Sequence, residues 1–530
     1  MSLHVKQIAK DASIVGGATL LSRVLGFFRD MIVAYVLGAG PAADAFYVAY
    51  RLPNTLRRLF AEGSMTMAFV PVFSDLRQKK GDEAAFAMTR SAFMWLVLIL
   101  GFITLAAIIF ARPLTQLIAP GFTHDPAQMD LTVRLVRIVF PYIIEISIVA
   151  LCMGALNSMG HFLTPALATS ELNTIVIAGC GVAWLFGLDV PHALAWSVIV
   201  GGVGQMYMQY PAMKRFGFSW FGPWKFMDEG VKRMGKLMLP TVFGAAVYQI
   251  NIMVGQGLAS CLAVGSISSL YYADRLVQFP LGVFGTAVGT VSLPSLARLA
   301  ASGQMPEFKH TLSASLSLTL FICLPATAGL IALADPMVQV LFGRGAFTHE
   351  AAQATSMALM AYAVGLPAFA CVRPLISAFY ALHDTKTPVL AGFVSVVAYI
   401  ALGFAVVKFP LNLMGSTLGH LTQAYPLRLV GLALATSLSS WLNVLLLGMA
   451  LSARLGRWSD MKSTTLKSII LSMAIGLGAW LTPGNKYVSL ALIAVWAVVY
   501  MALAVALKVE EATLLLAFIR KRLVRRAGTA

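Results

Sequence analysis

The sequence predicts an all-α polytopic membrane protein, and three observations carry that prediction. The 530 residues are 59% hydrophobic and only 12% charged, and their mean hydropathy is +0.80. Apolar stretches of about 20 residues recur along the whole chain, and each is long enough to cross a bilayer as a helix. Lys and Arg are also distributed unevenly among the polar segments that separate these stretches. A soluble globular domain needs far less apolar surface than this chain carries.

About fourteen spans are expected, in two six-helix lobes followed by two C-terminal helices. They lie near residues 13–38, 43–73, 91–111, 131–156, 165–187, 191–213, 237–258, 267–297, 311–334, 353–380, 388–408, 427–451, 466–482 and 487–507. If the N-terminus is cytoplasmic, most of the 39 Lys and Arg fall in cytoplasmic segments. The outer loops then keep only Arg112, Arg344, Arg428 and Lys486. This bias follows the positive-inside rule and predicts that both termini are cytoplasmic.

The net charge of +17 therefore indicates membrane orientation and contact with anionic lipid headgroups, and not nucleic acid. No small-residue cleavage site follows the first apolar run, so we expect no signal peptide. The cysteines have no metal-ligand or redox spacing, and we expect neither metal sites nor disulfides. The basic tail, residues 508–530, has the pattern of an interfacial amphipathic helix.

Short matches at one offset indicate an internal duplication. "ALNSMGHFLTPALA" begins at Ala155 and "AFYALHDTKTPVLA" begins at Ala378, 223 residues later. "FYVAYRL" (46–52) matches "LYYADRL" (270–276) at an offset of 224, and "VPVF" matches "LPSL" at 223. Three matches in the same order predict two homologous halves.

The duplication fixes the expected domains. Each half has six spans, so both halves enter the membrane in the same direction and an axis along the membrane normal relates them. Such lobes leave a central cleft that binds substrate. The predicted segments are an N-terminal lobe, a cytoplasmic linker, a C-terminal lobe, a final pair of spans and the tail: 1–215, 216–236, 237–452, 463–507 and 508–530.

Arginines inside these spans are the candidate functional residues. A charge at the bilayer centre is unfavourable by about 2.5–3.5 kcal/mol, so buried charges line protein or water. Seven cations are expected in or near the cleft: Arg23, Arg29, Arg51, Arg57, Arg58, Arg275 and Arg373. Four acids are expected to pair with them or to gate the cleft: Asp30, Asp44, Glu62 and Asp274. The surplus of guanidinium groups predicts an anionic ligand, and arginine rather than lysine favours bidentate binding of phosphate or carboxylate. Internal ion pairs, such as Arg58 with Glu62 or Arg23 with Asp30, are the alternative.

Alternating access needs helices that bend. Pro53 interrupts the second predicted span, and Gly63 follows it. Pro280 and Gly282 occupy the corresponding part of the eighth. We predict hinges at these positions, although Gly and Pro in membrane helices also serve close packing.

The segments "SRVLGFFRD", "DAFYVAYRLPNTLRRLFAEG", "AFVPVF" and "YYADRL" resemble the signature segments of the MurJ (MviN) family. These are lipid II flippases of peptidoglycan synthesis in the MOP exporter superfamily, and the resemblance covers essentially the whole chain. It implies that Arg23, Arg29, Arg58 and Arg275 hold the diphosphate of the undecaprenyl-linked precursor. Ser22, Asp44, Asn54 and Glu62 match further polar positions of the family.

The resemblance also implies a function. The protein is expected to flip lipid II from the inner to the outer leaflet of the bacterial cytoplasmic membrane by alternating access, which serves cell wall biogenesis and cell shape. The final two spans would form a groove for the lipid tail. A monomer without cofactor is expected, and cell-wall synthases are plausible partners by pathway alone.

One departure concerns the coupling ion. Some family members carry acids on the seventh and eleventh spans that resemble a sodium site. Here the seventh span offers Gln249 and Asn251, and the eleventh has no acid. Sodium coupling by that site is therefore doubtful, and the membrane potential is the alternative driving force for an anionic head.

Three rival functions remain at this level. A MATE-type antiporter shares the superfamily architecture, but cation binding calls for acids rather than surplus arginine. A polysaccharide-unit flippase would carry a similar polyprenyl diphosphate. A membrane enzyme acting on such lipids needs clustered acids or a general base. The acids of the predicted outer loops, Asp125, Asp130, Asp189, Asp335 and Glu350, form no motif.

Overall fold

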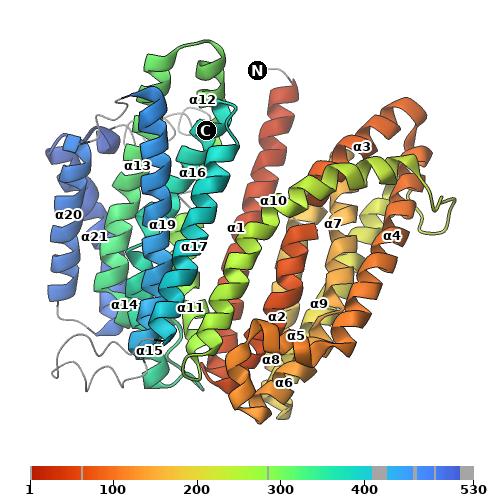
Figure 1. The fold of residues 1–530 in the computed structure, drawn as a ribbon, viewed down its shortest axis with the longest axis horizontal. Helices are drawn as coiled ribbons and strands as arrows, with labels where there is room; N and C mark the ends of the chain where they lie inside the picture. The colour runs from red at the N-terminus through yellow and green to blue at the C-terminus, as the bar shows by residue number, and fades with distance from the viewer. Residues whose placement is uncertain are drawn as a thin grey trace, which may run out of the picture. The chain divides into compact units, whose positions relative to one another are not determined.

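The computed structural model describes residues 3–60, 64–282, 286–408, 426–456, 462–482 and 485–513, and all regular structure in these ranges is helical (Figure 1). The all-α prediction is confirmed. Eight helical segments among the described residues are long and apolar enough to cross a membrane. The exact count of fourteen spans stays a prediction.

The N-terminal repeat contains α1 to α9. Its helices are α1 (Leu3–Leu37), α2 (Pro41–Phe60), α3 (Ser64–Lys80), α4 (Asp82–Ile109), α5 (Ala111–Ile118), the short 3-10 helix η1 (Pro120–His124), α6 (Pro126–Val139), α7 (Tyr142–Ser158), α8 (Leu163–Phe186) and α9 (Val190–Arg215).

The C-terminal repeat follows the same order. Its helices are α10 (Glu229–Ser260), α11 (Ser266–Pro280), α12 (Thr286–Ala301), α13 (Met305–Ala332), α14 (Ala334–Leu341), α15 (His349–Ala363), α16 (Leu366–Ala381), α17 (Lys386–Lys408) and α19 (Pro426–Leu455). Two further helices, α20 (Lys462–Leu481) and α21 (Lys486–Ala506), come after the repeat.

The predicted duplication is visible helix by helix. The first residues of α4 and α13, Asp82 and Met305, are 223 residues apart. The same spacing separates the first residues of α5 and α14, Ala111 and Ala334. Corresponding side chains also meet at the starts of two helices: His161 Nε2 contacts Thr164 Oγ1 at 2.6 Å at the start of α8, and Thr387 Oγ1 donates to Asp384 at 2.8 Å at the start of α17.

Several predicted spans consist of two helices in tandem. The stretch 131–156 is divided between α6 and α7 around Pro141, and 353–380 between α15 and α16 around Gly365. Proline lacks an N–H donor and interrupts the helical hydrogen-bond ladder. Since both repeats divide their spans at matching places, the breaks belong to the fold and not to one local sequence.

The chain folds as two compact units, Met1–Ser268 with Gly345–Phe347, and Ser269–Arg344 with Thr348–Ala530. In the first unit α1 packs on α8, α8 on α9, and α10 on α3. Phe69, Phe73, Phe86 and Phe218 form a chain of ring contacts 5.4 to 6.3 Å apart in its core. The predicted lobes follow the repeat rather than compactness, and their boundaries stay a prediction.

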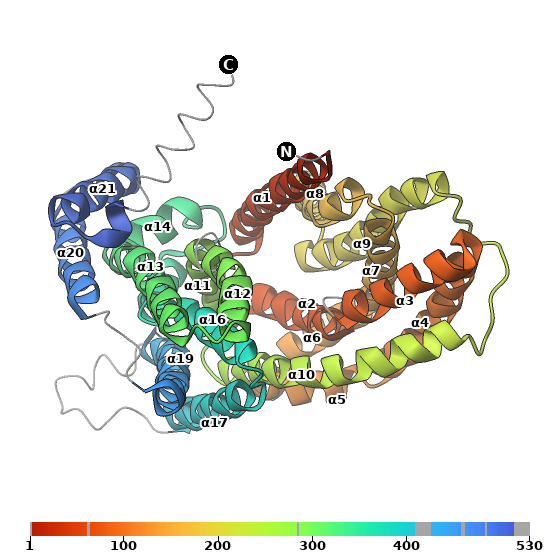
Figure 2. The ribbon, with the colours of Figure 1, turned by 90° about the horizontal axis from the view of Figure 1, so that it is seen from above.

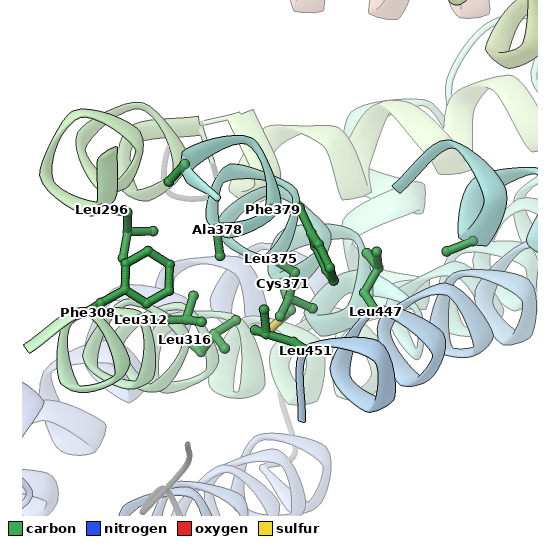
Figure 3. Close-up of a cluster of buried hydrophobic side chains, with 12 residues drawn as sticks. Leu296, Phe308, Leu312, Leu316, Cys371, Leu375, Ala378, Phe379, Leu447 and Leu451 are labelled. Atoms are coloured by element: carbon green, nitrogen blue, oxygen red, sulfur yellow. The ribbon is translucent and has the colours of Figure 1, made fainter. Parts of the chain in front are cut away.

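In the second unit, α12, α13, α16 and α19 enclose a hydrophobic cluster. Figure 3 shows Leu296, Phe308, Leu375 and Leu447 from these four helices pointing toward one another. The final helices α20 and α21 stand beside α13 and α14 (Figure 2). A second cluster, which includes Phe321 of α13 and Tyr500 of α21, fixes them there. The Tyr500 hydroxyl donates to the Phe321 carbonyl oxygen at 2.8 Å.

Candidate functional site

Arg29 on α1 is held by an ion pair and an amide. Its Nη2 lies 2.7 Å from Asp30 Oδ1, and its Nη1 donates to Asn173 Oδ1 of α8 at 3.1 Å. The Asn173 amide in turn donates to the Ser22 carbonyl oxygen at 3.2 Å. Asp30 is only 1% exposed, so the nearby guanidinium stabilises its charge. Asp30 thus pairs with its chain neighbour Arg29 and not with Arg23, which lies two turns earlier on the same face of the helix.

The arginines of α2 follow one side of the helix. Arg51 and Arg58 are half-buried, seven residues apart on the stripe that also contains buried Thr55. Arg57 donates from Nε to Asn54 Oδ1 at 2.9 Å. Pro53 lies inside α2 and provides no donor to the Ala49 carbonyl group one turn earlier.

Asp44 near the start of α2 makes a helix-capping contact. Its carboxylate accepts from Gly265 N at 2.7 Å, Ser268 N at 2.8 Å and Ser268 Oγ at 2.7 Å. Gly265 immediately precedes α11 and Ser268 lies in its first turn, and Asp44 is 2% exposed. A carboxylate at a helix N-terminus accepts hydrogen bonds from free N–H groups and interacts favourably with the helix dipole. The contacts of Asp44 are therefore with a helix end, where the sequence predicted charge pairing.

The second unit carries two of the predicted cations, Arg275 and Arg373. The Arg275 guanidinium lies 5.7 Å from the centre of the Tyr271 ring, in a cation–π contact within α11. Asp274 accepts from Gln278 Nε2 at 2.6 Å. Arg373 is exposed on α16.

The predicted set thus divides by partner. Arg29, Arg57 and Arg275 contact groups of the protein. Within the described residues, Arg23, Arg51, Arg58 and Arg373 have no hydrogen bond, ion pair or ring contact. Two predicted positions, Glu62 and Gly63, lie outside the described residues. Of the predicted hinges, Pro280 ends α11, and Gly282 is the last described residue before α12.

Paired glycine contacts were not foreseen from the sequence. Gly121 lies so close to the end of α10 that a Cβ there would come within 1.9 Å of the Ser260 carbonyl oxygen. Gly345, in the corresponding loop of the other repeat, lies against Tyr35 near the end of α1, and Ala346 N donates to Tyr35 O at 2.8 Å. The first helix of each repeat thus packs against a loop of the other. The signal in the sequence is a glycine at matching places in both repeats.

A groove of about 1110 Å³ lies beside the final helices, lined by α13, α14, α20 and the start of α21. Its wall is apolar, with Leu324, Ile331 and Leu477 among the lining residues. Asp335, Gln339 and Lys486 line it at the end where α13 and α20 terminate. An elongated apolar chain with a polar end fits such a surface.

Comparison with known proteins agrees with this architecture. A family profile described as "Lipid II flippase MurJ" matches residues 33–487. A "Probable lipid II flippase MurJ" from Rhizobium meliloti is 38% identical over 455 residues, which is 85% of this chain and 82% of that protein. A protein of the same description from Vibrio cholerae is 37% identical over 452 residues, 83% of this chain and 82% of its own length.

Solved structures show the same fold. "Lipid II flippase MurJ, inward closed conformation" has a TM-score of 0.76 at 27% identity, and it covers 92% of this chain and 97% of that one. A multidrug resistance MATE transporter of the MOP superfamily has a TM-score of 0.65 at 13% identity, over 81% of this chain and 95% of that one, and shares the fold alone. With the family profile, these matches establish that the chain belongs to the MurJ family.

Proposed function

We propose that this protein is a flippase that moves lipid II, the undecaprenyl-diphosphate-linked peptidoglycan precursor, from the inner to the outer leaflet by alternating access. The observation that carries the proposal is a set of guanidinium groups that have no hydrogen bond, ion pair or ring contact within the described part of the chain: Arg23, Arg51, Arg58 and Arg373. An unpaired cation in a membrane protein is stable where water or an anionic ligand reaches it. A diphosphate offers the paired oxygen atoms that arginine binds in bidentate fashion.

The two ends of such a lipid need different surroundings. The charged head would be bound by the arginines, with Ser22 and Asn54 as further polar contacts. The polyprenyl tail would remain in hydrocarbon and occupy the apolar groove beside α13 and α20, which is large enough for several isoprene units. This division explains why the chain combines a polar arginine set with two extra helices outside the repeat.

Complementation of a depleted bacterium tests the proposal. Arg23→Ala, Arg58→Ala and Arg275→Ala should each cause lysis, with precursor accumulating on the inner leaflet although the protein is expressed normally. The matched control is Arg112→Ala, which removes an exposed arginine paired with Asp130. Full growth with all three arginine variants would contradict the proposed binding set.

An assay with purified protein separates a flippase from an enzyme that acts on the same lipid. The protein in vesicles should relocate labelled lipid II across the bilayer without altering it chemically. A new covalent product would contradict the transporter assignment.

For the driving force we propose the membrane potential. A negative interior favours outward movement of an anionic head by about 2.3 kcal/mol per charge per 100 mV. Proteoliposomes prepared without a sodium gradient give the test. Flipping should slow when the potential is collapsed, and an unchanged rate would refute this coupling.

For orientation we propose a multi-pass protein of the bacterial cytoplasmic membrane with both termini in the cytoplasm, as the basic clusters indicate. Reporter fusions at the two ends should both report the cytoplasm. A monomer in contact with anionic lipids fits the same picture, and mass measurement in nanodiscs checks it.

A further inference from the structure

The connection between the two repeats is fixed to α4. This inter-repeat strap, residues 216–228, joins α9 to α10 (yellow-green beside α4 in Figure 1). The buried Arg90 side chain of α4 donates from Nε to the Pro223 carbonyl oxygen at 2.8 Å and from Nη1 to the Ser219 carbonyl oxygen at 3.1 Å. Its Nη2 lies 2.5 Å from Glu83. One guanidinium therefore binds two carbonyl groups of the strap and one carboxylate of α4.

Further contacts continue the attachment along α4. Lys225 N donates to Ser91 Oγ at 2.9 Å, and Trp95 Nε1 donates to the Phe226 carbonyl oxygen at 2.7 Å. The rings of Phe93 and Trp220 are 4.6 Å apart. A Cβ on Gly222 would come within 2.7 Å of the Arg90 guanidinium, so the backbone approaches that group as closely as glycine permits. The strap is thus bound mainly through its backbone and through the Trp220 and Phe226 rings, and several of its side chains remain largely exposed.

Those side chains are large and apolar. Phe221 is 94% exposed, Met227 65%, Phe226 51% and Trp224 45%. Three basic residues of the same segment and its approach, Lys214, Arg215 and Lys225, are also exposed. Aromatic rings with adjacent basic groups are typical of segments at a membrane–water interface.

The expected depth of the strap in the membrane also indicates an interfacial segment. The predicted span of α4 begins at Ser91, and Trp95 lies four residues further, about 6 Å deeper at 1.5 Å per residue. Because Phe226 is hydrogen-bonded to Trp95, its backbone lies beside the first turns of the predicted span. Phe221 is next to Gly222, which contacts Arg90, the residue before that span begins.

We propose that the inter-repeat strap is a preformed anchor for the inner-leaflet surface, in which the exposed aromatic residues enter the headgroup region and Lys214, Arg215 and Lys225 bind anionic phospholipid. The leaflet rests on the proposed orientation of the chain, while the proposal stands apart from the transported substrate. Anionic lipid is favoured over a protein partner because the exposed apolar residues lie beside the start of a predicted membrane span and Lys214, Arg215 and Lys225 are close to them in the chain.

Site-specific fluorescence on the full-length protein tests the anchor. Phe221→Cys is combined with Cys261→Ser, which removes the exposed native thiol, and an environment-sensitive dye is attached in nanodiscs. The control position is Ser302→Cys, an exposed residue between α12 and α13. Lipid-attached nitroxide should quench the dye at 221, and iodide should quench it several-fold less than the dye at 302. Equal iodide quenching at both positions would show that the strap faces water, and protection from iodide without nitroxide quenching would show contact with protein only; either result would overturn the proposal.

A second experiment tests the contribution of the three basic residues to lipid binding. Protection at position 221 should be greater in phosphatidylglycerol than in phosphatidylcholine, and replacing Lys214, Arg215 and Lys225 by Gln should abolish that difference. Inorganic phosphate should not change the signal. If phosphate reproduced the effect of phosphatidylglycerol, the segment would be a site for the free anion and the lipid assignment would be wrong.

The attachment of the strap to α4 is tested by Arg90→Gln, which should raise iodide quenching at position 221 and accelerate tryptic cleavage after Lys225. If that variant does not fold, Trp95→Phe removes one hydrogen bond and keeps the ring. Unchanged cleavage in the folded variant would contradict a strap that is fixed before it meets lipid.

Discussion

Replacing Asp44 should loosen the start of α11 far more than an ordinary helix cap. In Asp44→Ala the N–H groups of Gly265 and Ser268 lose their acceptor in a buried place. Each unsatisfied buried donor is unfavourable by about 1–3 kcal/mol, so the local loss is roughly 2–6 kcal/mol. Asp44→Asn keeps one acceptor oxygen and should lose about half as much.

Hydrogen exchange followed by mass spectrometry measures this locally. Because 1.4 kcal/mol is a factor of ten in an equilibrium constant, protection of the peptide containing Gly265 and Ser268 should fall at least about thirtyfold in Asp44→Ala. Asp125→Ala is the matched control, since Asp125 caps α6 through Ala127 N and Gln128 N but is exposed. That cap should be worth only about 1 kcal/mol. Equal small effects of the two substitutions would refute the argument that burial makes the Asp44 cap strong.

Three further predictions follow from single contacts. Arg29→Ala should destabilise the protein by about 3–5 kcal/mol because the buried Asp30 carboxylate loses the guanidinium that lies 2.7 Å away. Adding Asp30→Asn should restore most of the thermal midpoint, and no recovery would argue against the pair. Gly121→Ala should lower the thermal midpoint strongly, because the added Cβ would lie 1.9 Å from the Ser260 carbonyl oxygen. Gly101→Ala is the control, since a Cβ there meets no atom within 4 Å, and equal midpoints of the two variants would contradict the close approach. Hydrogen bonding, chiefly from the Thr387 backbone N–H group of α17, holds the pKa of Asp384 below its ordinary value of 3.8. The ionised carboxylate therefore stabilises the folded protein above pH 3.8, and this stabilisation is lost as the pH falls through the lower pKa of the folded state. Asp384→Asn should therefore reduce the drop in thermal midpoint between pH 7 and pH 3, and an unchanged drop would contradict the assignment.

Much of the fold could be predicted because its signals are local. Hydropathy indicated the spans, and short sequence matches indicated the duplication. The arginine set was also visible as charge where hydrocarbon was expected. What the sequence could not supply were partners that are distant in the chain: Asn173 for Arg29, Ser268 for Asp44, and the strap carbonyl groups for Arg90. These contacts depend on helix packing, and backbone acceptors leave no trace in residue type.

The capping contact of Asp44 also explains why the two repeats differ where they meet. Asp44 and Ser268 are 224 residues apart, the offset at which "FYVAYRL" and "LYYADRL" align, so equivalent positions of the two repeats contact each other. An aspartate in both copies would bring two carboxylates together in a buried place, and the mutual repulsion would force one of them to take up a proton. A serine in both copies would leave the first N–H groups of α11 without a charged acceptor. An acid facing a hydroxyl avoids both problems, and a contact between equivalent positions of two repeats is a place where such divergence is favoured.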